Sequence, residues 1–96
     1  MSNVTRLGDI GAPHDACAAV PLITSSENVF VNGLGCGRVS DSYAGHGCFI
    51  HPTHTPIISS GSSSVFVNGL PIARIGDSTG CGGVVIEGSP NVWAGD

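Results

Sequence analysis

A six-residue segment, Val-Phe-Val-Asn-Gly-Leu, occurs twice in this chain, at residues 29–34 and again at 65–70. A third, partial copy reads Val-Trp-Ala-Gly at 92–95. In both complete copies Asn-Gly follows a β-rich run, and these two residue types tolerate the positive φ of a type I′ turn. The sequence therefore predicts a β-hairpin at each complete copy, and a final half-hairpin that closes against the first strand. Three near-equal units predict a body with pseudo-threefold symmetry.

A second motif, Arg-x-x-Asp, occurs once in each repeat, at 6–9, 38–41 and 74–77. A guanidinium group forms bidentate pairs with carboxylates. We therefore expect each Arg to pair with carboxylates or loop carbonyls near its turn and to hold one repeat to the next. A catalytic or anion-binding ring of arginines is the alternative interpretation of this motif.

The length of 96 residues predicts one domain, residues 1–96, with a marginal hydrophobic core. We see no amphipathic helical period of useful length, and short apolar runs alternate with Gly- and Ser-rich turns, so the expected fold class is all-β. Domains of this size often add a staple, such as disulfides, a metal or a partner. Four cysteines in a reducing compartment favour thiols or metal ligands over a disulfide framework. Cys17, Cys36 and Cys48 have no equivalents in the repeats and are expected to be small buried or part-exposed thiols, with a disulfide among them as the alternative.

The charge and the hydropathy pattern exclude several classes of partner. The chain has no Lys and a formal net charge of −4, whereas binding to nucleic acid requires a basic surface. It also lacks the basic cluster of a membrane-surface motif and the run of ~20 apolar residues that spans a bilayer. The first residues do not form the apolar core of a signal peptide. We therefore expect synthesis in the cytoplasm and export, if any, by another machine.

The side chains that can bind a metal lie in the loops between each Arg-x-x-Asp motif and the next strand. His14 and His46 each follow the motif Asp by five residues, and Cys81 follows it by four. His54 and Cys81 each precede the next repeated strand by eleven residues. Equivalent loops of a pseudo-threefold body meet at its axis, so these four residues are predicted to converge there. Three imidazoles and one thiolate suit tetrahedral zinc, and a closed four-ligand site has a structural role.

Two alternatives to this ligand set follow from the same residues. The histidines could be unrelated surface side chains. His51 has no counterpart in the repeat register, so it is interpreted as a residue beside the site. The alternative is that His51 binds the metal in place of His46 or His54. A small metalloenzyme would need an open coordination position. Because the chain also lacks a Gly-x-Ser-x-Gly elbow, a Walker loop and a His-Glu-x-x-His motif, we expect that it is not an enzyme.

The segment Val-Phe-Val-Asn-Gly-Leu-Pro-Ile-Ala-Arg-Ile-Gly-Asp at 65–77 closely resembles the PAAR-repeat proteins, which are named after a Pro-Ala-Ala-Arg stretch. Residues 71–74 read Pro-Ile-Ala-Arg, and the more divergent 35–38 read Gly-Cys-Gly-Arg. Residues 81–92 are similar to the closing repeat of the family. The resemblance covers essentially the whole chain.

This resemblance implies a small cone of three pseudo-threefold β-hairpin repeats with a metal near the apex. In the family the metal is usually zinc bound by three His and one Cys, with iron as the alternative. Carried over position by position, the ligands are His14, His46, His54 and Cys81. The base of the cone is expected to cap a trimeric β-helical spike, of the VgrG or phage central-spike type, with one copy per trimer.

The expected function is that of a tip protein, which sharpens the spike of a contractile phage tail or a type VI secretion system for membrane piercing. Contact with the target membrane would be transient. Because no N- or C-terminal extension is seen, we expect that the chain carries no toxin domain of its own. An adaptor module that docks a toxin effector is the alternative function.

Overall fold

The computed structural model describes residues 1–13, 17–48, 51–80 and 82–96, with the backbone alone at 46–48 and 51–53. Every regular element in these ranges is a short β-strand, which confirms the predicted all-β class. None of the described segments forms a helix that could cross a membrane. The ten strands, in chain order, are β1 (Ser2–Asn3), β2 (Ile10–Gly11), β3 (Val20–Pro21), β4 (Phe30–Val31), β5 (Leu34–Gly35), β6 (His46–Cys48), β7 (His51–His54), β8 (Phe66–Val67), β9 (Leu70–Pro71) and β10 (Trp93–Ala94).

The strands form five two-stranded antiparallel sheets: β1–β10, β2–β3, β4–β5, β6–β7 and β8–β9. Both repeated segments are hairpins, and their turn residues Asn32, Gly33, Asn68 and Gly69 have φ values of 54°, 79°, 55° and 78°. These are the positive angles of a type I′ turn, as the Asn-Gly pairs predicted. The last half-hairpin pairs with the first strand, which confirms the expected closure of the chain.

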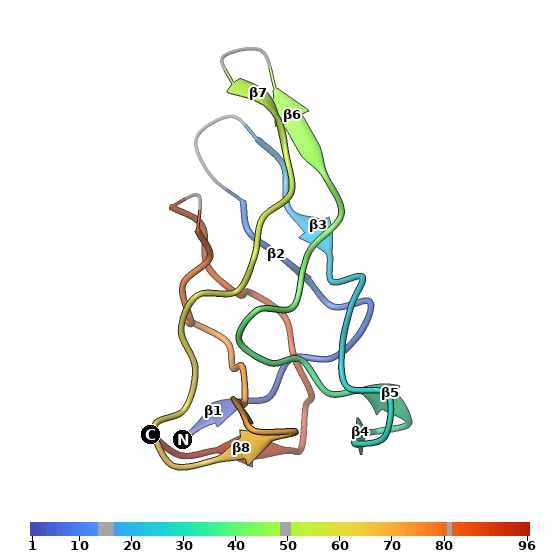
Figure 1. Ribbon diagram of the computed structural model, residues 1–96, viewed down its shortest axis with the longest axis vertical. Coiled ribbons are helices and arrows are strands. Elements are labelled where there is room, and N and C mark those ends of the chain that lie inside the picture. The colour runs from blue at the N-terminus through green and yellow to red at the C-terminus, as the bar shows by residue number, and fades with distance from the viewer. Residues whose placement is uncertain (14–16, 49–50, 81) are drawn as a thin grey trace.

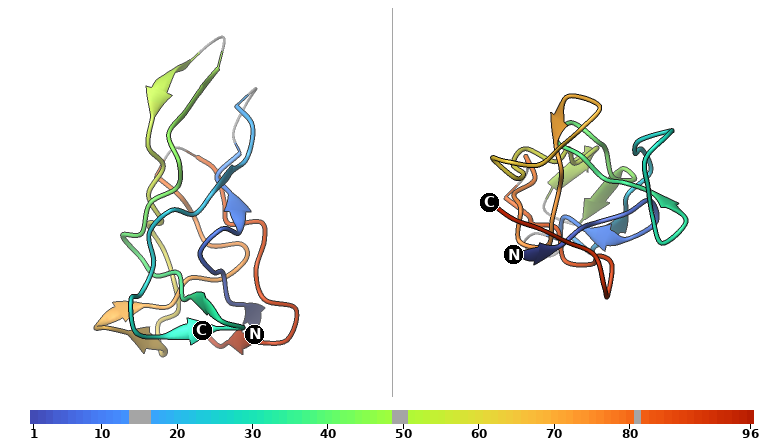
Figure 2. Two further views of the ribbon diagram at one scale, coloured as in Figure 1. Left: turned by 90° about the vertical axis from the view of Figure 1, so that its right-hand side faces the viewer. Right: turned by 90° about the horizontal axis from the view of Figure 1, so that it is seen from below.

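The molecule is elongated, with principal extents of 37 × 24 × 22 Å. Strand pairs β1–β10, β4–β5 and β8–β9 form a broad base that also holds both termini (Figure 1). Pairs β2–β3 and β6–β7 stand above this base, and the view from below shows the base hairpins arranged around a central axis (Figure 2). This is the conical arrangement of hairpins that the family resemblance implied.

A closed ring of three backbone hydrogen bonds lies at the centre of the repeats. Thr5 N donates to Ala73 O (3.1 Å), Ala73 N donates to Gly37 O (3.0 Å), and Gly37 N donates to Thr5 O (3.0 Å). All three residues are buried, so these groups have no access to water and depend on one another. A reciprocal ring of this kind closes only if the three repeats are related by an approximate threefold axis.

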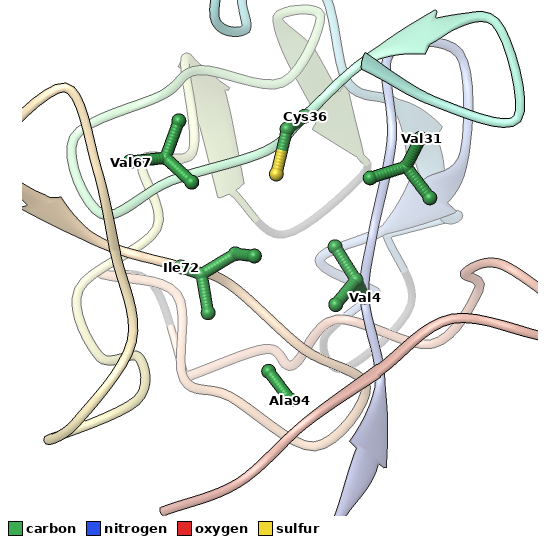
Figure 3. Close-up of a cluster of buried hydrophobic side chains, with 6 residues drawn as sticks. All are labelled: Val4, Val31, Cys36, Val67, Ile72 and Ala94. Atoms are coloured by element: carbon green, nitrogen blue, oxygen red, sulfur yellow. The ribbon is translucent and has the colours of Figure 1, made fainter. Parts of the chain in front are cut away.

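Two hydrophobic clusters form the core. The cluster nearer the base takes two side chains from each repeat (Figure 3), namely Val4, Val31, Cys36, Val67, Ile72 and Ala94. The second cluster consists of Ala12, Leu22, Tyr43, Ile58, Ala73 and Val85. Cys36 is a buried free thiol, as expected, and burial raises its pKa to about 11. The first cluster thus consists of two triplets of equivalent residues, whereas the second contains one such triplet, Leu22, Ile58 and Val85.

One triplet shows how unequal side chains share the axis. Gly11, Tyr43 and Thr79 each follow their motif Asp by two residues. Tyr43 is fully buried, and burial raises its pKa to about 12. A Cβ atom added at Gly11 would lie 2.7 Å from the Tyr43 hydroxyl oxygen. The smallest residue in one repeat thus makes room for the largest in another.

Candidate metal centre

The three loops that follow the Arg-x-x-Asp motifs all point toward the end of the molecule opposite the base (Figures 1 and 2). Each loop leaves the body at its motif Asp. The geometry of the three motifs therefore decides how the loops approach one another.

Each motif is a bidentate ion pair that also fixes the backbone. In the first, Asp9 Oδ2 accepts from Arg6 Nε (2.9 Å) and from Arg6 N (2.9 Å), and Oδ1 accepts from Nη2 (3.0 Å). The same three bonds join Arg38 to Asp41 and Arg74 to Asp77. The hydrogen bond to the Asp is the main cause that raises the pKa of each Arg. These contacts confirm the predicted pairing of each Arg with a carboxylate.

The remaining guanidinium nitrogen of each Arg connects to the next hairpin. Nη1 of Arg6 donates to Asn32 Oδ1 (3.1 Å), and Nη1 of Arg38 donates to Asn68 Oδ1 (3.1 Å). The third repeat has no Asn at this position, and Arg74 Nη1 donates to the carbonyl oxygen of Gly95 (2.8 Å). The arginines therefore hold neighbouring repeats together, as expected. The alternative of an anion-binding ring has no support, because these nitrogens already donate to protein oxygens.

The second loop contains β6 and β7, and its register bears on the histidines. His46 and His54 are direct cross-strand partners in this antiparallel pair. His51 lies nearer the connection and pairs with Cys48, and the register shifts between the two pairs. Directly opposite positions approach each other more closely than other cross-strand positions. The backbone thus brings together the two histidines that the repeat register selected.

The third loop contacts both the first and the second. On one side Ala12 N donates to Val84 O (2.7 Å), and a Cβ atom added at Gly83 would lie 2.8 Å from Pro13 O. On the other side Gly80 N donates to Ile57 O (2.9 Å). Gly80 and Gly83 lie on either side of Cys81, the predicted ligand of the third loop. Pro13 directly precedes His14, the predicted ligand of the first loop. The described backbone around all three loops therefore converges.

The structure places the predicted ligands unequally. His14 and Cys81 lie outside the described residues, and of His46 only the backbone is described. His54 is half-buried. No group of three His, Cys, Asp or Glu side chains that could hold a metal occurs within 1–13, 17–48, 51–80 and 82–96. The set of four ligands remains a prediction, supported by the convergence of its flanking segments.

One prediction about the cysteines is wrong. Cys17 was expected to be a small thiol, but it is disulfide-bonded and buried. The side chain of Cys48 lies outside the described residues. The spacing of the repeats carries no signal for this bond, because Cys17 has no equivalent in the other repeats and lies in a loop that packs against its neighbours. The first loop is thus cross-linked as well as hydrogen-bonded.

Sequence analysis also missed a second role of the hairpin asparagines. Besides forming the turns, Asn32 and Asn68 accept from Ser89 Oγ (2.5 Å) and Ser26 Oγ (2.7 Å) of neighbouring repeats. A sequence signal was available, because a Ser stands three residues before the Val of every repeat. This network connects the base hairpins to one another.

Comparison with known protein families gives one match. A family model described as the PAAR motif matches residues 10–87, so the chain belongs to the PAAR-motif family. Among proteins with curated descriptions, none matches this chain. PAAR-motif proteins are structural proteins of spike tips, in the setting of type VI secretion systems and phage tails.

The packing of the third loop generates a test. Gly83→Ala places a methyl group 2.8 Å from the backbone of Ala12 and Pro13, so the first and third loops must separate. We expect a loss of about 1–3 kcal/mol in the free energy of unfolding, measured in urea, as for other overpacked sites. Gly80→Ala is the control in the same loop, since its nearest contact is ordinary at 3.8 Å. Equal stability of both variants would contradict the described packing.

Proposed function

We propose that this PAAR-motif protein caps the end of a trimeric β-helical spike and sharpens it for membrane piercing by a contractile injection machine. The observation that carries the proposal is the approximate threefold axis, defined by the backbone ring of Thr5, Gly37 and Ala73. A monomer with this symmetry offers three similar faces to a partner with a true threefold axis.

The base supplies the surface for such a partner. Phe30, Phe66 and Trp93 occupy equivalent positions in β4, β8 and β10, and their exposed fractions are 60%, 55% and 53%. Exposed aromatic residues are enriched at protein interfaces. A trimeric β-helix ends in three equivalent strand edges, which are unpaired and prone to further pairing. One copy of this chain would cover all three edges at once.

The narrow end requires rigidity more than catalysis. We infer that His14, His46, His54 and Cys81 bind one metal ion there, with zinc favoured by three imidazoles and one thiolate and iron as the alternative. The donor set fits, because the β6–β7 register places His46 and His54 opposite each other and the flanks of the first and third loops contact each other. Metal binding supplies folding free energy, on the order of 10 kcal/mol or more in small domains. That energy would keep the tip folded under load.

The same arrangement argues against catalysis. Four protein ligands leave no coordination position for a substrate, and the arginine donors pair with protein oxygens. We propose that the protein is not an enzyme, that it is made in the cytoplasm, and that it leaves as part of the assembled spike. A role in docking a toxin effector is the second candidate function. It is favoured by a groove on the side of the first repeat, which is lined by Leu7, Ile23 and Glu27 among others.

The metal proposal predicts close to one equivalent of bound metal per chain, measured by elemental analysis of protein purified without added metal. His54→Ala and Cys81→Ala should lower both the metal content and the melting temperature. His51→Ala is the matched control and should do much less. If the His51 variant loses the metal while the His54 variant keeps it, the repeat register is wrong by one histidine. A disulfide mapped to Cys81 would also contradict the ligand set.

The capping proposal predicts one copy of this chain for every three chains of the spike. The measurement is native mass spectrometry or light scattering of the protein mixed with its cognate spike fragment. The base docks only once on the trimer, because one monomer already carries all three units. A complex of three copies with one trimer, a stable homotrimer of this chain alone, or no binding to any trimeric β-helix would contradict the tip function even with the metal site intact.

A further inference from the structure

A groove on the side of the first repeat breaks the threefold pattern. It has a volume of about 460 Å³ and is lined by Leu7, Ile23, Thr24, Ser25, Glu27 and Phe30, among others. Leu7, Ile23 and Phe30 are 38%, 53% and 60% exposed, so three apolar side chains of the lining face solvent. Glu27 is the only ionisable residue of the lining. We call this surface the repeat-1 groove.

The equivalent positions of the other repeats differ in character. The residue after the buried aliphatic triplet Leu22, Ile58 and Val85 is Ile23 in the first repeat, Ser59 in the second and Ile86 in the third. Glu27 is replaced by Ser63 and Pro90. The second repeat therefore lacks the aliphatic wall. In the third repeat Glu87 directly follows Ile86, but its carboxylate already accepts a hydrogen bond from Ile10 N (3.0 Å). Within the described residues, the first repeat combines an aliphatic wall with a carboxylate that has no hydrogen bond.

The carboxylate of Glu27 is available to a partner. Within the described part of the chain it has no hydrogen bond and no ion pair within 4.0 Å. Arg38 interacts electrostatically with Glu27, but its guanidinium group is already bound to Asp41 and Asn68. A partner with a positive charge would therefore meet an uncompensated carboxylate.

A second copy of this chain is a poor occupant for the groove. The chain has no Lys, and its three arginines are bound to Asp9, Asp41 and Asp77. Its formal net charge of −4 also opposes self-association. The spike is a poor occupant as well, because a threefold partner would contact all three repeats alike. The cation must come from a different protein that contacts one repeat only.

We propose that the repeat-1 groove binds an extended peptide segment of a partner protein, in which aliphatic side chains flank a Lys or Arg. The aliphatic side chains would pack on Leu7, Ile23 and Phe30, and the cation would pair with Glu27. One such groove per chain means one partner per tip. The groove lies in described residues alone and is separate from the metal site. It shares Phe30 with the base, so the test uses the protein without the spike, and its outcome is distinguishable from those of the metal and capping tests.

The probe is a capped pentapeptide, Gly-Ile-Lys-Ile-Gly, titrated into the full-length ¹⁵N-labelled protein and followed by NMR. We expect saturable shifts confined to the amides of Leu7, residues 23–30 and Gly35. A peptide with Gln in place of Lys should bind about two- to fivefold more weakly, the range of an exposed ion pair. Added salt should remove this difference, because the pair is screened.

Three variants make the test specific. Glu27→Gln should bind both peptides alike, at the weaker affinity. Ile23→Ser, which installs the residue of the second repeat, should weaken binding about fivefold or more through loss of apolar contact. Ile86→Ser is the matched control in the third repeat and should leave binding unchanged. All three positions are on the surface, so we expect the melting temperature to stay unchanged. Measuring it checks that each variant is folded.

Four results would overturn the proposal. These are the absence of saturable shifts, shifts spread equally over the three repeats, equal binding of the Lys and Gln peptides, and concentration-dependent shifts of the same amides without peptide. The last result would identify a second copy of the chain as the occupant.

Discussion

The ring of backbone hydrogen bonds among Thr5, Gly37 and Ala73 is the constraint on which the rest of the structure depends. Each residue donates to one neighbouring repeat and accepts from the other. The ring lies between the two core clusters, so it ties the base hairpins to the loops above them. Removing one repeat would leave two buried polar groups without partners, which is costly in an apolar interior. The three repeats therefore form one cooperative unit.

Symmetry of the backbone coexists with asymmetry of the side chains. At the ring the three side chains are Thr5, Gly37 and Ala73, and a Cβ atom added at Gly37 would lie 2.6 Å from the Thr5 methyl carbon. The pairing of Gly11 with Tyr43 follows the same rule. At these positions the repeats differ where they meet, and a small residue in one repeat lies against a larger one in another.

The same asymmetry separates two kinds of surface. The base repeats its aromatic residues three times and suits a threefold partner. The side of the first repeat carries Glu27 and Ile23 together and suits a partner that binds once. A tip that caps a symmetric spike and also recognises one asymmetric partner needs both kinds of surface in one chain.

Much of the fold was predictable from local sequence patterns. The Asn-Gly turns, the closure of the last half-hairpin on the first strand and the Arg-Asp pairs each follow from a short segment whose chemistry permits one geometry. The pairing of His46 with His54 agrees with the register of the repeats. The ring could not be predicted, because backbone groups carry no sequence signal and Thr, Gly and Ala share no side-chain chemistry. The disulfide of Cys17 was missed because its position has no counterpart in the other repeats.

Hydrogen exchange at the ring tests the central claim most directly. If the ring unites the three repeats, the amides of Thr5, Gly37 and Ala73 open only when the whole molecule unfolds. Their exchange, followed by NMR, should then give one common free energy, equal to that of global unfolding in denaturant. The amides of the turn residues Gly33 and Gly69 should exchange far faster. Fast exchange at any one of the three ring amides would contradict the account, because it would show that one repeat can open while the other two stay folded.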